Sequence, residues 1–300
     1  MKRIFFCFLI FLLLFTFSCK TKQQEKDTFN PVFSTYKTDS SSSKTPVVKN
    51  EIFYGILTPV EVSTIFTRLG VPYNKAILNP IANSDQYLSS AKAAINTGIY
   101  GVDFGYIKMF GVGQELIDYV VTIREMSNKL GIPDKFLSEP VRKIQSNDSN
   151  PDSILIIMND AYVKMEDHLR AGGRESTAGL MVMGGWIEAL YIATQLVYDP
   201  AKPDPEVVQK IAQQKYTLTT LLSFMKNYYD DPVVVYYTKK LKYLKNYFDS
   251  FDIYFKKGDL EIDKSRKIFR SSGSEMTVTV DTLNKIRNYV KQLRTEMVTP

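Results

Sequence analysis

The chain has 300 residues, of which 44% are hydrophobic, and its formal net charge is +6 at pH 7. This length suits one large domain or two small ones, and so mild a charge excess gives no support for nucleic-acid binding. Its single histidine, His168, excludes a zinc site built on histidines, because one ligand cannot hold the metal.

Residues 1–18 are predicted to be a cleaved signal peptide. Lys2 and Arg3 are followed by an apolar run that ends at Phe17. This run of about fourteen residues is too short to cross a hydrocarbon core, which needs roughly 20. The only cysteines are Cys7, which would leave with the signal peptide, and Cys19, which comes directly after it.

The residues Thr16-Phe17-Ser18-Cys19 resemble the lipobox of bacterial lipoproteins, although leucine is usual at Thr16 and Phe17 is bulkier than usual. The resemblance implies that Cys19 is acylated and anchors the mature chain in a lipid bilayer, which two or more acyl chains do stably. Lys20 stands where an aspartate would favour inner-membrane retention in some bacteria, so we expect the outer membrane. The alternative is an ordinary secretory signal with an incidental cysteine. An acylated Cys19 leaves no free thiol, which excludes thiolate nucleophiles and thiolate metal ligands.

The rest of the chain divides into a tether and a helical domain. Residues 19–50 are rich in Ser, Thr, Lys and Gln without an apolar period, which predicts a flexible tether. Residues 53–300 repeat apolar side chains at spacings of three and four, which predicts a single all-α domain of about nine antiparallel packed helices. Proline, glycine and capping residues place these helices at 58–69, 84–110, 114–130, 135–144, 152–171, 175–198, 204–228, 231–257 and 281–297. Only Met276 to Val280 alternates like a strand, and we expect an extended linker there because no partner strand is evident.

The segment Thr97 to Tyr106, TGIYGVDFGY, combines three glycines with a carboxylate inside a predicted helix. Gly98, Gly101 and Gly105 fall on one face, and each costs about 1 kcal/mol relative to alanine. We therefore expect another backbone or a ligand to approach that face closely. Asp103 lies among apolar neighbours, where an unpaired carboxylate would be costly to bury.

The segment Gly172 to Tyr191 is the second unusual stretch, with five glycines and the only tryptophan, Trp186. Glu188 lies in its otherwise apolar helix, and Arg174 lies at the N-terminus of that helix. We expect the two glycine-rich helices to pack tightly, with Asp103 neutralised by Arg174 or by tyrosine hydroxyls. The alternative is a ligand pocket between helices, lined by Asp103, Arg174, Trp186 and Glu188.

The remaining motifs are weaker evidence for a catalytic or binding site. His168 lies beside an apolar seam and is expected to be a boundary residue. Ser89-Ser90-Ala91-Lys92 matches the Ser-x-x-Lys spacing of serine acyl-enzymes, but no companion motif accompanies it. The C-terminal third is rich in tyrosine and lysine, a mixture that can bind glycans, lipid headgroups or acidic partners. The simpler interpretation is that Tyr237 and the phenylalanines are buried while the lysines form a solvated face.

The stretches TGIYGVDFGY and GGRESTAGLMVMGGWIEALYIAT resemble a family of helical lipoproteins of Gram-negative bacteria without an assigned activity. The resemblance covers roughly residues 55–297, and it implies an all-α domain and a lipid anchor but supplies no substrate or catalytic residues.

These features predict a non-enzymatic binding or scaffolding module in the cell envelope, with no cofactor or metal. Its expected partner is the bilayer, through acylated Cys19, and an envelope protein or a small-molecule ligand is a further candidate. One alternative is an envelope enzyme that uses Asp103 and Glu188 as a carboxylate pair. Another is a subunit of a larger envelope assembly.

Overall fold

The computed structural model describes residues 65–145, 151–255, 260–263, 268–271 and 274–300. All of these belong to one compact unit, Thr38–Pro300. The predicted signal peptide, Cys19, the tether and the start of the helix predicted at Thr58 lie outside the described residues. Residues 65–69 are helical, and Gly70 ends that helix with a φ of 62°.

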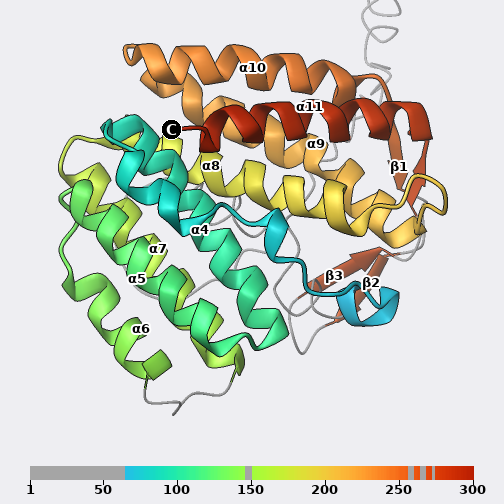
Figure 1. Ribbon diagram of the computed structural model, residues 1–300. Coiled ribbons are helices and arrows are strands. Elements are labelled where there is room, and N and C mark those ends of the chain that lie inside the picture. The colour runs from blue at the N-terminus through green and yellow to red at the C-terminus, as the bar shows by residue number, and fades with distance from the viewer. Residues whose placement is uncertain (1–64, 146–150, 256–259, 264–267, 272–273) are drawn as a thin grey trace, which may run out of the picture. The chain divides into compact units, whose positions relative to one another are not determined.

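The described residues form an all-α domain, as predicted, and contain eight α-helices besides the helical residues 65–69 (Figure 1). The helices are α4 (Ser90–Phe110), α5 (Gly113–Lys129), α6 (Lys135–Gln145), α7 (Pro151–Ala171), α8 (Glu175–Ile192), α9 (Pro205–Met225), α10 (Pro232–Asp249) and α11 (Val280–Val298). Short 3-10 helices precede α4 and follow α9, and a π-helical turn, η5 (Ala193–Val197), continues α8.

Local capping chemistry explains where several helices begin and end. Asp204 and Asp231 accept backbone hydrogen bonds from the first turns of α9 and α10, and each is followed by a proline in that first turn. Gly111 ends α4 in the left-handed region, with a φ of 68°. These boundaries match the sequence prediction.

The predicted start of α4 near residue 84 is wrong. Residues 81–86 form the 3-10 helix η4 (Ile81–Gln86), and α4 begins at Ser90, where the Ser89 side chain accepts from the Lys92 N–H. The intervening Tyr87 is fully buried, and its hydroxyl donates to the Val298 carbonyl over 2.7 Å. The chain is therefore not one continuous helix from residue 84 to α4, and the interruption places Tyr87 against the end of α11.

The prediction of one helix through residues 231–257 is also wrong, because α10 ends at Asp249. Residues Ile253–Phe255 form strand β1, which pairs antiparallel with β4 (Ser274–Met276). Met276 thus has a strand partner, contrary to expectation, whereas residues 277–279 form no strand, as expected of an extended linker. The predicted helix was extended this far because Phe255 continues the aromatic spacing of α10. Isoleucine, tyrosine and phenylalanine also favour strands, and in β1 they pair with a neighbouring strand. A second antiparallel pair joins β2 (Leu260–Asp263) to β3 (Ile268–Ser271).

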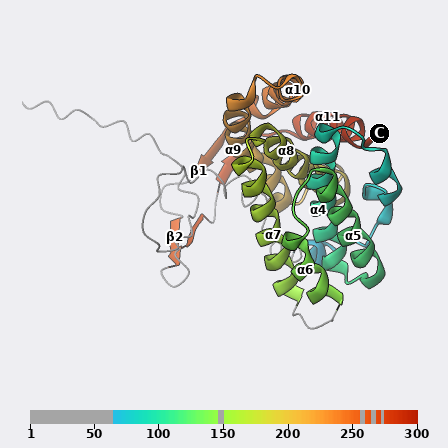
Figure 2. The same cartoon turned by 90° about the vertical axis from the view of Figure 1, so that its left-hand side faces the viewer.

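Helix α8 occupies the centre of the bundle and contacts α4, α7, α9, α10 and α11 (Figures 1 and 2). Its residues are buried almost without interruption from Ala178 to Glu188. Within the described part of the chain, Glu175–Val197 is the one stretch long and apolar enough to span a membrane, with a mean hydropathy of 1.4. Because 67% of that apolar window is buried inside the protein, its composition is that of a core helix.

Candidate functional site

Helices α4 and α8 approach until their backbones touch. A Cβ atom on Gly98 would lie 2.0 Å from the Met181 carbonyl oxygen, and one on Gly184 would lie 2.1 Å from the Ile95 carbonyl oxygen. Only glycine fits at these two positions, so the predicted tight packing of the two glycine-rich helices is confirmed. The single glycine face on α4 is not confirmed. Gly101 faces Tyr162 of α7, whereas a Cβ atom on Gly105 would meet no other described residue within 4 Å.

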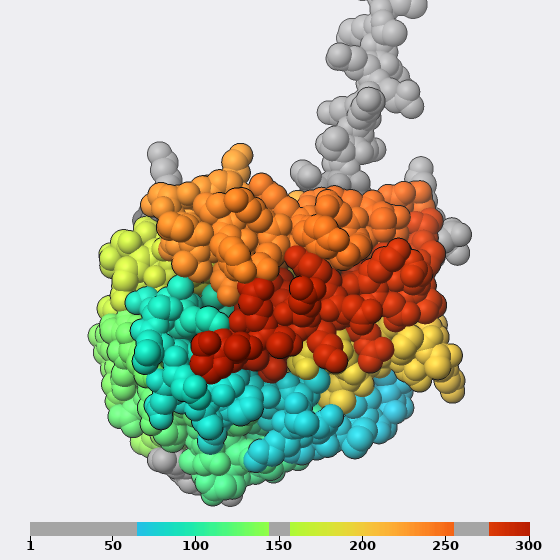
Figure 3. Space-filling model, turned by 45° about the horizontal axis from the view of Figure 1, so that its top comes forward, coloured from blue at the N-terminus to red at the C-terminus, as the bar shows by residue number. Residues whose placement is uncertain are grey.

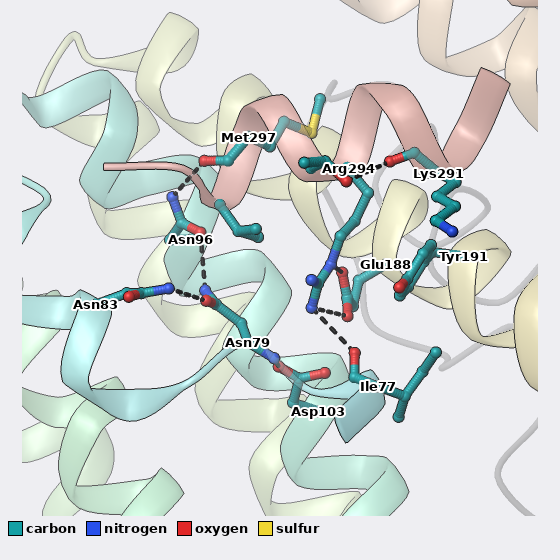
Figure 4. Close-up of polar contacts among 12 residues, drawn as sticks. Ile77, Asn79, Asn83, Asn96, Asp103, Glu188, Tyr191, Lys291, Arg294 and Met297 are labelled. Atoms are coloured by element: carbon teal, nitrogen blue, oxygen red, sulfur yellow. Dashed lines mark hydrogen bonds and ion pairs between the residues drawn. The ribbon is translucent and has the colours of Figure 1, made fainter. Parts of the chain in front are cut away.

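The close approach brings Asp103 of α4 and Glu188 of α8 together in the interior, where both are 0% exposed (Figure 4). Asp103 Oδ2 accepts the Asn79 backbone N–H over 3.0 Å, while Oδ1 meets no donor among the described residues. Burial raises the pKa of Asp103 well above its usual value, and the negative charge of Glu188 and a hydrogen bond to Glu188 raise it further. The raised pKa favours the protonated form of Asp103 beside the Glu188 carboxylate.

Arg294 of α11 is the cation of this cluster. Its Nε and Nη2 atoms donate to the two oxygens of Glu188, each over 2.9 Å, and Nη2 also donates to the Ile77 carbonyl over 3.1 Å. The guanidinium carbon lies 4.7 Å from the centre of the Tyr191 ring. A protonated Asp103, an ionised Glu188 and Arg294 together carry no net charge, which makes their joint burial tolerable.

The prediction that Arg174 neutralises Asp103 is wrong. Arg174 occupies the N-cap position of α8 without a side-chain capping hydrogen bond, and its guanidinium donates to the Leu130 carbonyl. Glu188 lies fourteen residues further along, which is about 20 Å along the helix axis at 1.5 Å per residue. The sequence did contain a signal for Arg294, because it interrupts the apolar stripe that Val290, Leu293 and Met297 form on the C-terminal helix.

Buried amides extend the network from Asp103 to the end of the chain. The Asn79 side chain donates to Asn96 over 3.0 Å, and Asn96 donates to the Met297 carbonyl over 3.1 Å. Lys92 donates to the carbonyls of Glu296 and Thr299. Asn96 and Lys92 thereby satisfy the Met297 and Glu296 carbonyls at the end of α11, which have no partner within their own helix. Sequence reasoning did not find them, because a lone asparagine carries no periodic signal.

Trp186 does not belong to this cluster. It lies two residues before Glu188 and so projects from the opposite side of α8, where its Nε1–H donates to Gln214 of α9 over 3.1 Å. His168 is half-buried, with its ring centre 5.7 Å from that of Phe136, as expected of a boundary residue. The four predicted pocket residues therefore do not line one pocket: Asp103 and Glu188 meet, while Arg174 and Trp186 lie elsewhere.

The arrangement offers little to a substrate. Neither carboxyl has surface that water or substrate can reach. Among the described residues, no group of three or more His, Cys, Asp or Glu side chains is placed to hold a metal ion. The cluster acts as a neutral polar joint between α4, α8 and α11.

Comparisons with protein-family models, with curated proteins and with solved structures gave no match for this chain. The resemblance to helical lipoproteins therefore stays a prediction, and the interpretation of the site rests on its own geometry.

Proposed function

We propose that the protein is a membrane-tethered lipoprotein of the cell envelope whose helical body binds or organises a partner and catalyses no reaction. The observation that carries this proposal is the complete burial of the two candidate carboxyls. Asp103 and Glu188 are 0% exposed, and Glu188 is paired with Arg294. A carboxylate-dependent enzyme would need at least one of them in contact with a substrate, so this alternative is not favoured.

The membrane tether rests on the N-terminal sequence. A short apolar run, a cysteine directly after it and a polar stretch to about Asn50 form the pattern of a lipoprotein precursor. Cells fed a clickable palmitate analogue should label the wild-type chain, and Cys19→Ala should abolish the label. Label that persists in Cys19→Ala would contradict the anchor.

The binding role is tested by crosslinking in intact cells, followed by mass spectrometry of what is captured through residues 53–300. A defined envelope component captured by the wild type, and not by a Cys19→Ala chain that has lost its membrane location, supports the proposal. Turnover of an envelope polymer by the purified protein, abolished by Asp103→Asn, would contradict it.

A further inference from the structure

Helices α10 and α11 lie side by side at the surface (Figures 1 and 3). They run antiparallel, because Tyr236 near the start of α10 contacts Glu296 near the end of α11, while Tyr247 contacts Tyr289. Four tyrosines follow the seam between the two helices. We call Tyr236, Tyr243, Tyr247 and Tyr289 the tyrosine ridge.

The ridge is exposed but ordered by its own contacts. Tyr236 and Tyr243 are 48% and 52% exposed. The ring centre of Tyr243 lies 5.5 Å from that of Tyr247 and 5.0 Å from that of Tyr289. The Tyr236 hydroxyl donates to Glu296, and the Tyr289 hydroxyl donates to the Lys240 carbonyl. Large aromatic groups are thus held half in the protein and half in solvent.

Lysines accompany the ridge. Helix α10 carries four lysines and one aspartate, a net charge of +3. Lys240 pairs with Glu296, and Lys245 pairs with Asp249. Lys239 and Lys242 are exposed and form no ion pair with a described carboxylate, and Lys242 only approaches the Tyr229 ring, at 5.5 Å. The surface therefore has positive charge available for an anionic partner.

The opposite side of α10, and not the ridge, supplies the fully buried residues of this helix. Leu241, Leu244 and Phe248 are fully buried and already anchor the helix to the bundle. Tyr247 and Tyr289 pack partly against the core, whereas Tyr236 and Tyr243 are about half exposed. Edge-to-face packing covers part of the ring faces that a sugar would need for stacking. Clustered tyrosines with free lysines are instead the composition of a membrane–water interface.

We propose that the tyrosine ridge, with Lys239 and Lys242, rests on the surface of an anionic phospholipid bilayer. The tyrosine rings enter the headgroup layer with their hydroxyls at its polar side, and the two ammonium groups meet lipid phosphates. This inference rests on the proposed function, since a lipid anchor would hold the chain at a bilayer. It adds that the helical body touches the bilayer and does so through one defined face.

The test uses residues 19–300 with Cys19→Ser, which retain the whole compact unit and carry no acyl chain. This protein is mixed with vesicles of phosphatidylethanolamine and phosphatidylglycerol, and with phosphatidylcholine vesicles as a neutral surface. We expect it to float with the anionic vesicles at low salt and to be released near 0.5 M salt. Lys239→Gln/Lys242→Gln should lower the partition coefficient onto anionic vesicles about 30-fold, because each lysine contributes roughly a five-fold factor and the two factors multiply. Tyr243→Ala should weaken it several-fold.

Matched controls remove the same groups elsewhere. Lys135 and Lys202 are exposed lysines outside α10 and α11, so Lys135→Gln/Lys202→Gln makes the same change in charge. Leu88, 90% exposed, provides an apolar control as Leu88→Ala. Circular dichroism and melting temperature confirm that each variant is folded.

No flotation of the wild type, or an equal loss in the lysine control pair, overturns the proposal. So does a lysine pair variant that still floats but loses a crosslinked envelope protein in cells, because the ridge would then bind an acidic protein. Failure here is separable from failure of the lipid anchor, because palmitate labelling at Cys19 is measured on a different variant and in cells.

Discussion

Replacing Arg294 with methionine removes the cation that pairs with Glu188 in the buried cluster. Arg294 and Glu188 have 8% and 0% of their side chains exposed, and the two bonds between them are each 2.9 Å long. Methionine keeps most of the apolar volume on α11 but leaves the Glu188 carboxylate without a partner charge beside Asp103. Breaking a buried pair from one side costs about 3–5 kcal/mol. In a domain of this size the melting temperature should fall by roughly 6–20 °C.

The reverse variant, Glu188→Gln, should lose less stability. Burial dominates the raised pKa of Asp103, but Arg294 acts in the opposite direction. With Glu188 neutral, Asp103 can release its proton and serve as the counter-ion of Arg294. The double variant Arg294→Met/Glu188→Gln has no ion left at this position, and it should recover about 2 kcal/mol or more relative to Arg294→Met.

Guanidinium unfolding, followed by circular dichroism and by fluorescence, gives the free energy of unfolding of each variant. Trp186 is the only tryptophan of the chain and lies on α8 two residues before Glu188, so its emission reports on the same helix. A loss below about 1 kcal/mol in Arg294→Met, or a coupling energy below about 0.5 kcal/mol in the double-mutant cycle, would refute the charge balance described above.

Three further variants test the buried cluster and the contact between α4 and α8. Because the pKa of Asp103 is raised in the folded chain, the folded chain keeps a proton that the unfolded chain releases near the usual pKa of 3.8. The contribution of this group to the free energy of unfolding is therefore fully present below that pH. Above it, the contribution falls by about 1.4 kcal/mol per pH unit until the pKa of the folded chain is reached. Asp103→Asn should therefore be at least as stable as the wild type at pH 7, and the difference between the two should shrink on acidification; parallel stability curves from pH 4 to pH 8 would contradict a buried proton. Gly184→Ala should destabilise by about 1–3 kcal/mol, because its methyl group would meet the Ile95 carbonyl, whereas Gly105→Ala on open helix surface should stabilise by about 0.5–1 kcal/mol. Thermal melts compare the two, and similar shifts would show that the α4–α8 contact is looser than described.

The sequence determined by itself those features that depend on neighbouring residues. An aspartate followed by proline starts α9 and α10, and Gly111 ends α4, because capping and left-handed backbone are decided within one turn. The crowded glycines marked a close helix contact because glycine is costly in a helix unless space is short. The all-α class followed from apolar periodicity for the same local reason.

Only the tertiary structure decided which distant residues share a site. Asp103 and Glu188 were both marked as unusual, but their cation lies 106 residues beyond Glu188 on another helix. The pairing of β1 with β4 and the delayed start of α4 depend likewise on contacts made far along the chain. A buried charge must find a partner, yet the choice among partners is made by which helices pack together, and no local pattern encodes that choice.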